Sequence, residues 1–301
     1  MASLNPALST LPLAAPRRRA WRRRIFDACG WGLCGLAFLC LGAATVWILA
    51  TVVLHGLGAL NWKMITQGTV GTGGGLMNAI EGTLILALGG IALALPPGLA
   101  AGIYLAEFDT GWLAPVIRFF SDVLVGVPSI VIGYFGYVTL VEDLGWGFSA
   151  AAGGIALAII ALPYITRGSE MAIRQVPREM RDAAYALGAS DSRVVMSITV
   201  PLALPGVLTG VLLALAIAVG ETAPLLYTAG WSNFLWNGHL IQEPVGYLTY
   251  AIWAFITEPF ASAHALAYAA ALLVTGFVLV ISIFARLALD ENTGWRRRMR
   301  G

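Results

Sequence analysis

Long runs of apolar residues, separated by short polar segments, dominate the pattern of this chain. A helix needs about 20 mostly apolar residues to cross the hydrocarbon layer of a membrane. Runs of roughly this length predict membrane-spanning helices at 29–54, 76–101, 116–141, 148–166, 202–229 and 265–289. We therefore expect an all-α, polytopic membrane protein with six transmembrane helices.

A shorter apolar segment at 245–256 is a candidate seventh span. It has about 12 residues, too few to cross ~30 Å of hydrocarbon as a helix, and we predict an interfacial or re-entrant piece. The positions of the Lys and Arg residues also favour six spans over seven. With six spans only Lys63 of the 18 Lys and Arg residues lies in an outer loop, whereas a seventh span would place the C-terminal arginines outside, against the positive-inside rule.

Arginine-rich segments flank the apolar part of the chain, including six arginines within residues 17–24. Such clusters mark the cytoplasmic side of a membrane. A signal peptide is the alternative, but its apolar region has roughly 7–15 residues, and the run at 29–54 is longer. We expect cytoplasmic tails at 1–28 and 290–301, a first helix with its outer loop at 29–75, and a membrane core at 76–289.

The composition agrees with a membrane protein and narrows the classes of function that we expect. The chain is 58% hydrophobic and 11% charged, whereas a soluble domain carries about 25% charged residues. A net charge of +2 gives no basic field for a nucleic acid, so we expect no nucleic-acid partner. The three cysteines lie in the first apolar run and the three histidines are scattered, so no metal centre is expected.

The longest polar interruption in the second half lies at 176–201, which we call the coupling segment for reasons given below. Pro177 suits the first turn of a helix. Met180, Ala183, Ala184 and Leu187 follow at helical spacing and form one apolar stripe. Gly188 suits the left-handed position that ends a helix. Ser190 or Asp191 then caps a second short helix, which Pro201 closes before the next span.

This segment is either a loop on the membrane surface or a docking surface for a partner. Arginines and an apolar stripe suit both alternatives. Acidic residues mixed with the basic ones, and small alanines that permit close contact, favour docking. The residues expected to contact the partner are Arg181, Asp182, Ala183, Ala184, Leu187 and Gly188.

The coupling segment resembles the EAA loop of ABC-importer permeases. Its sequence DAAYALG, followed by nine residues and I-x-V-P, has the spacing of that loop, with Asp182 in place of the usual Glu and Val200 in place of Leu. The resemblance implies the type I importer permease fold and a helix that docks on an ATPase dimer. The chain contains no G-x-x-x-x-G-K-[ST] pattern. A separate subunit is thus expected to bind ATP, and this chain is expected to need no cofactor and to be no enzyme.

Further segments resemble the permease subunits of bacterial phosphate importers. They are Asn78–Leu84, Pro96–Phe108, Val125–Tyr137, Leu162–Pro177, Leu204–Ala216 and Gly220–Gly230. The resemblance implies a multi-pass protein of the bacterial inner membrane, a second permease subunit and a periplasmic or lipid-anchored phosphate-binding protein. Ile217 departs from that family, which usually carries an Arg there. A molybdate, tungstate or sulfate importer is the nearest alternative, and a secondary transporter without an ATPase is a remote one.

An anion that crosses a low-dielectric interior needs cationic groups or N–H donors along its path. Arg167 and Glu170 share a helix face at the inner end of the fourth span, and the resemblance favours a role at the inner mouth of the path over a structural ion pair. Glu221 and Thr222, placed within the fifth span, and Thr83 and Ser129 are the other candidates for the path; each also suits helix packing. Kinks are expected at Pro128, at Pro224 and at the pair of prolines that begins at position 96.

Overall fold

A computed structural model describes residues 17–108 and 111–298, with side chains described at 21, 23, 24, 26–108 and 111–287. The chain divides into two compact units, Met1–Thr51 and Val52–Gly301, which we describe separately. The described part of the first unit belongs to helix α1 (Arg17–Ala59). The part of α1 from Phe26 to Ala59 is long and apolar enough to span a membrane, as predicted for the first helix.

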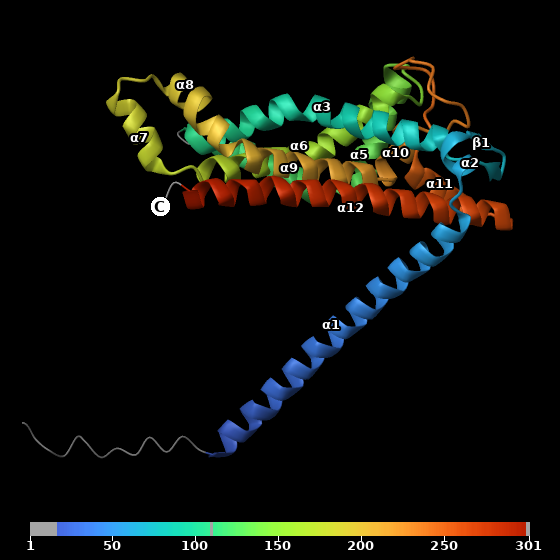
Figure 1. Ribbon diagram of the computed structural model, residues 1–301, viewed down its shortest axis with the longest axis horizontal. Coiled ribbons are helices and arrows are strands. Elements are labelled where there is room, and N and C mark those ends of the chain that lie inside the picture. Colours follow the sequence, from blue (N-terminus) through green and yellow to red (C-terminus); the bar gives the residue numbers. More distant parts are fainter. Residues whose placement is uncertain (1–16, 109–110, 299–301) are drawn as a thin grey trace, which may run out of the picture. The chain divides into compact units, whose positions relative to one another are not determined.

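The second unit contains a bundle of long helices that lie alongside one another (Figure 1). Helix α3 packs on α6, α6 on α9, and α9 on α12. These helices are α3 (Met77–Glu107), α6 (Ala150–Arg174), α9 (Val200–Gly220) and α12 (Ala261–Arg298). Small residues allow the close approach: Gly168 of α6 and Gly210 of α9 lie so near that a Cβ on Gly168 would be 3.0 Å from the Cα of Gly210.

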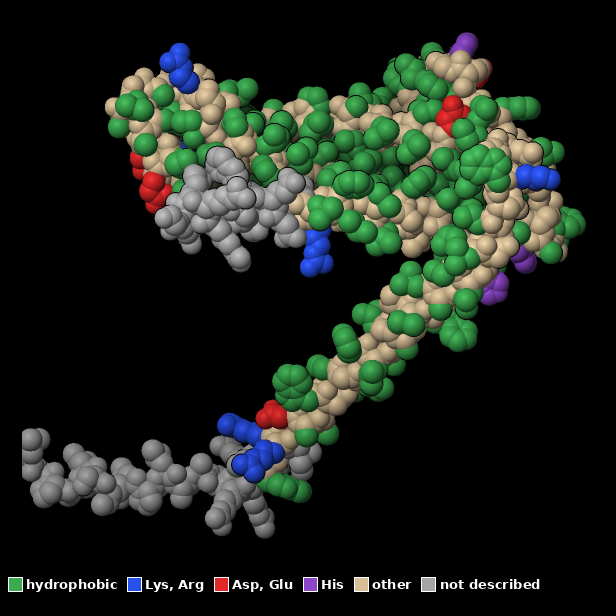
Figure 2. Space-filling view, viewed as in Figure 1, with side chains coloured by type: hydrophobic (Ala, Val, Ile, Leu, Met, Phe, Trp, Pro, Cys, Tyr) green, Lys and Arg blue, Asp and Glu red, His purple; other side chains and the backbone are tan. Residues whose placement is uncertain are grey.

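Short elements cover the two ends of this bundle (Figure 1). At one end lie α7 (Arg178–Ala186) and α8 (Asp191–Val194). At the other lie α2 (Trp62–Thr66), α10 (Ala223–Thr228), α11 (Leu248–Phe255) and an antiparallel pair of two-residue strands, β1 (Thr69–Val70) and β2 (Gly73–Gly74), in which Thr69 faces Gly74. Apart from this hairpin, the regular elements of the described residues are helices, as expected. Figure 2 shows hydrophobic side chains covering the middle of the bundle on the face in view.

The third predicted span is not one straight helix. It consists of α4 (Leu113–Gly126), then α5 (Ser129–Gly136), which continues as the π-helical turn η2 (Tyr137–Asp143), and the two parts are bent by 98°. Pro128 causes the break, because proline disfavours helical geometry at the residue before it, and Val127 is extended (φ −73°, ψ 127°). The described residues thus hold five helices of spanning length, or six if the bent pair counts as one span.

The second and fourth helices are longer than the apolar pattern predicted. Helix α3 continues to Glu107 and α6 to Arg174, because their polar last turns pair with neighbouring elements instead of ending at the apolar boundary. Helix α3 runs through Pro96 and Pro97 without a break. The next residue, Gly98, packs against Ile165 of α6, and such tertiary contacts override local propensity.

The coupling segment forms the predicted helix and glycine turn. Helix α7 begins after Pro177, and Gly188 has the left-handed φ of +81°. The second short helix differs from the prediction, because α8 passes through the π-helical turn η3 (Val195–Thr199) directly into α9. A wide π turn accommodates Pro201, whose ring would clash with the carbonyl of a regular preceding turn. Residues Asp191–Gly220 therefore form one continuous span.

The fifth span ends earlier than predicted. Helix α9 stops at Gly220, Glu221 is extended (φ −70°, ψ 138°), and α10 begins at Ala223 with Pro224 in its first turn. The apolar pattern had placed Glu221 and Thr222 within a span. This prediction was wrong, because both residues lie in a break between two helices. The segment at 245–256 agrees with the prediction of a short piece: α11 has eight residues, and Tyr250 stacks on Trp231 at 4.8 Å.

Candidate functional site

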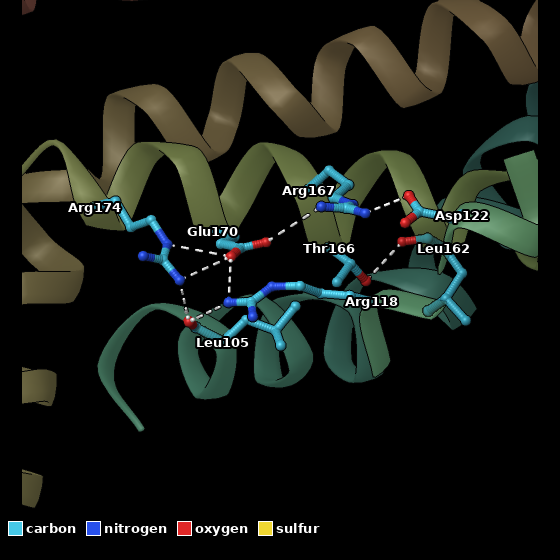
Figure 3. A network of polar contacts seen from close by, with 8 residues as sticks. All are labelled: Leu105, Arg118, Asp122, Leu162, Thr166, Arg167, Glu170 and Arg174. Carbon is cyan, nitrogen blue, oxygen red and sulfur yellow. Dashed lines mark hydrogen bonds and ion pairs between the residues drawn. The ribbon is translucent and has the colours of Figure 1, made fainter. Parts of the chain in front are cut away.

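Glu170 of α6 is the centre of a cluster of arginines (Figure 3). Its side chain is 9% exposed. Arg118 of α4 and Arg174, one turn further along α6, each place a guanidinium nitrogen 3.1 Å from Oε1. Arg167 approaches Oε2 at 3.9 Å. A buried carboxylate needs such partners, because an uncompensated charge in a low-dielectric interior is costly.

The same arginines join three helices. Arg174 donates to the main-chain oxygen of Leu105 at 2.9 Å, and Arg118 donates to it at 3.5 Å. Leu105 lies in the last turn of α3, whose carbonyls have no partner within the helix. The cluster thus joins α3, α4 and α6.

Arg167 forms its shorter ion pair with Asp122 of α4. Arg118 and Asp122 are one turn apart on α4, so α4 and α6 are joined by two pairs of opposite polarity, Arg118 with Glu170 and Asp122 with Arg167 (Figure 3). The five side chains comprise three arginines and two carboxylates.

A groove of about 450 Å³ lies beside this cluster, between α6 and α9. Its wall is mostly apolar and includes Gly168, Gly210 and Val125, and Arg167 supplies the charge among the described residues that line it. Arg167 thus faces both the ion-pair cluster and an open space, as a residue on an anion path would.

The other predicted path residues lie elsewhere. Ser129, at the start of α5, lies close to the carboxylate of Glu221, and Thr249 donates to the main-chain oxygen of Glu221 at 2.7 Å. Thr222 follows in the same break. The carboxylates that pair with Arg167 among the described residues are those of Asp122 and Glu170, and not that of Glu221.

Thr83 is buried and its hydroxyl is fully engaged. It donates to the Ala79 carbonyl at 2.7 Å and accepts from the Leu248 main-chain N–H at 2.9 Å. It therefore fastens α3 to α11. Glu81 accepts from the Trp236 main-chain N–H at 3.2 Å. Asp122 pairs with Arg167.

The six predicted docking residues divide into two groups. Asp182, Ala183, Leu187 and Gly188 are exposed, Leu187 to 89%. Ala184 is buried, and Arg181 points inward with 16% of its side chain exposed. A guanidinium nitrogen of Arg181 lies 3.1 Å from Oε1 of Glu107, at the end of α3, and Arg181 donates to the Ile173 carbonyl of α6 at 2.8 Å.

Four residues of these ion-pair networks were missed in the sequence: Arg118, Asp122, Arg174 and Glu107. Arg118 and Asp122 at a spacing of four were a usable signal, because charged residues near a span end are functional candidates. Their pairing with α6 depends on the packing of α4 against α6, which the apolar pattern does not show.

Membrane-length helices around a groove that is lined by Arg167, and an exposed helical segment at one end, are the features of an integral membrane permease. A profile of the family "Binding-protein-dependent transport system inner membrane component" matches residues 98–289, and the chain belongs to this family. Its relatives include the phosphate transport system permease protein PstA 2 of Mycobacterium bovis, 46% identical over 279 residues, which cover 92% of this chain and 93% of the relative. PstA of Yersinia pestis is 39% identical over 293 residues, which cover 94% and 96%.

A solved structure of the MetNI methionine ABC transporter in an inward-facing conformation shares the fold. The TM-score is 0.60 at 19% identity, over 71% of this chain and 95% of that chain. The predicted multi-pass, type I importer permease architecture is thereby confirmed, as is the resemblance to phosphate-importer permeases.

Proposed function

We propose that this chain is the permease subunit of an ATP-driven importer of inorganic phosphate. The cluster of Arg118, Arg167 and Arg174 around Glu170, beside a groove, carries the proposal. The substrate of the PstA relatives, as their names state it, supports phosphate. Ile217 is half-buried in α9 and contributes no cation, so Arg167 supplies the charge of the described groove.

The proposed partners follow from the family to which the chain belongs. They are a cytoplasmic ABC ATPase dimer that binds the ATP, a second, PstC-like permease subunit, a periplasmic or lipid-anchored phosphate-binding protein, and membrane lipids. The chain itself is proposed to have no ATPase site, no cofactor and no nucleic-acid partner. In the bacterial inner membrane both termini are proposed to face the cytoplasm, which places α7 on the ATPase side.

In this mechanism the cluster lies at the inner mouth of the path. The arginines lower the cost of bringing a phosphate dianion into a low-dielectric region. Glu170 and Asp122 offset the positive charge of the arginines that they pair with, so the anion is bound weakly enough to leave. The ATPase acts through α7, and it shifts the permease between conformations only as far as its states bind those conformations differently.

Uptake of labelled phosphate by the reconstituted complex, measured against molybdate and sulfate, tests the substrate. We expect Arg167→Gln to lower phosphate uptake at least tenfold with normal assembly, because it removes the charge in the groove. Arg286→Gln, on an exposed position of α12, is the matched control. Unchanged uptake by Arg167→Gln, or a preference for molybdate or sulfate, contradicts the proposal.

Docking is tested by co-purification with the ATPase. Leu187→Asp places a charge on the most exposed apolar side chain of the coupling segment, and we expect it to abolish co-purification while membrane insertion persists. Leu240→Asp, on an exposed leucine at the opposite end of the bundle, is the control. Retention of the ATPase by the Leu187 variant refutes docking through this surface.

A further inference from the structure

Asp122 is an exposed carboxylate that forms an ion pair with Arg167, the cation of the proposed anion path. Its side chain is 68% exposed, and its guanidinium partner on Arg167 is 36% exposed. An exposed carboxylate needs no partner to remain charged, since water solvates it. Burial therefore does not explain this contact, whereas burial does explain the arginines around Glu170.

The position of the pair connects it with the groove. Arg167 lines the groove from α6, and Val125, one turn after Asp122 on α4, lines it from the other side. An anion that enters the groove and reaches Arg167 meets a guanidinium already occupied by a carboxylate. A guanidinium binds carboxylate and phosphate oxygens with the same planar set of N–H donors.

We infer that Asp122 is a tethered competitor of the transported anion, and thereby a specificity-determining residue of the path. The inference rests on the proposed function and assigns a role to a residue outside the set predicted from the sequence. When the groove is empty, Asp122 neutralises Arg167; when phosphate arrives, it takes the place of Asp122 on Arg167. Only an anion that outcompetes a carboxylate held on the same protein gains the site, and the returning carboxylate helps to release it.

The exchange also changes a contact between helices. Two ion pairs join α4 to α6, and displacement of Asp122 removes one, leaving Arg118 with Glu170. Occupancy of the groove is thus coupled to the contact between the two helices, because the bound anion takes over one of the two charges that held α4 to α6.

Equilibrium binding of [³²P]phosphate to the purified complex, without the binding protein, tests the inference. In Asp122→Asn the competitor is neutral, and we expect phosphate to bind about twofold to fivefold more tightly. Asp122→Glu keeps the competing charge and should bind as the wild type does. Asp143→Asn, an exposed carboxylate on η2, is the matched control, and Asp122→Asn/Arg167→Gln should lose the gain.

Equal or weaker binding by Asp122→Asn overturns the inference, because Asp122 then holds Arg167 in place without competing. Absence of binding in all variants overturns it equally. Wild-type uptake of phosphate is measured in parallel. Failure of uptake alone refutes the proposed function, whereas intact uptake with unchanged binding in Asp122→Asn refutes only the role of Asp122.

Discussion

The ion pair between Arg181 and Glu107 leads to a quantitative prediction about the coupling segment. Both side chains are largely buried, at 16% and 7% exposed, and they join α7 to the end of α3. Replacing Glu107 by Gln leaves the guanidinium with a neutral partner. Removing one partner of a buried pair costs about 3–5 kcal/mol. Because Arg181 keeps its bond to the Ile173 carbonyl and some exposure, we expect about 2–3 kcal/mol.

We expect this loss of free energy to destabilise α7 locally, because the long helices of the bundle pack against one another without the Arg181–Glu107 pair. Hydrogen exchange of amides 178–190 in the purified complex measures it directly, because local opening sets the exchange rate. A loss of about 2–3 kcal/mol corresponds to roughly 30- to 150-fold faster exchange. The number of phosphate ions transported per ATP hydrolysed should fall, since a loosened α7 transmits less of the ATPase movement.

Two variants separate this effect from a general loss of charge. Glu179→Gln removes an exposed carboxylate from the first turn of α7 and should leave exchange and coupling nearly unchanged. Glu107→Met combined with Arg181→Met replaces the pair by apolar side chains, and we expect most of the protection to return. Unchanged exchange in Glu107→Gln would show that the pair does not hold α7 in place.

Three further substitutions test individual contacts. Thr83→Val removes the acceptor of a buried N–H and should destabilise the protein by about 1–3 kcal/mol in thermal unfolding, with uptake per folded complex unchanged; selective loss of uptake would place Thr83 on the path. Gly188→Val should cost about 1–2 kcal/mol, seen as faster exchange in α7, because its φ is +81°, and Gly188→Asn should be milder. Gly82→Ala brings a Cβ to 1.9 Å from the Gly246 oxygen, whereas Gly89→Ala meets nothing within 4 Å; only the first should lower the unfolding temperature.

The apolar pattern predicted those parts of the fold whose causes are local in sequence. The helix after Pro177 and its end at Gly188 depend on residues within the segment itself, and both formed as predicted. The break at Glu221 was missed because the residues on both sides are apolar, so hydropathy does not change there. Pro224, which begins α10, was the available signal, although we had assigned it a kink.

The site was less predictable, because it is assembled from several helices. Arg167 and Glu170 share a face of one helix, and their proximity follows from their spacing. Arg118 reaches Glu170 only because α4 lies against α6, with the chain bent by 98° after it. Contacts of this kind depend on tertiary packing, which no local pattern of apolar and polar residues contains.

The close contact of Gly168 with Gly210 has a mechanical consequence for the continuous helix Asp191–Gly220. At 1.5 Å per residue, a straight rod pivoting at this contact has arms of about 28 Å toward the ATPase side and about 15 Å toward Glu221. A displacement applied at the long arm arrives at the break near Glu221 at about half its size and with about twice the force. The contact between these two glycines would thus set the ratio between a large movement at the Asp191 end of the helix and a small movement at its Gly220 end.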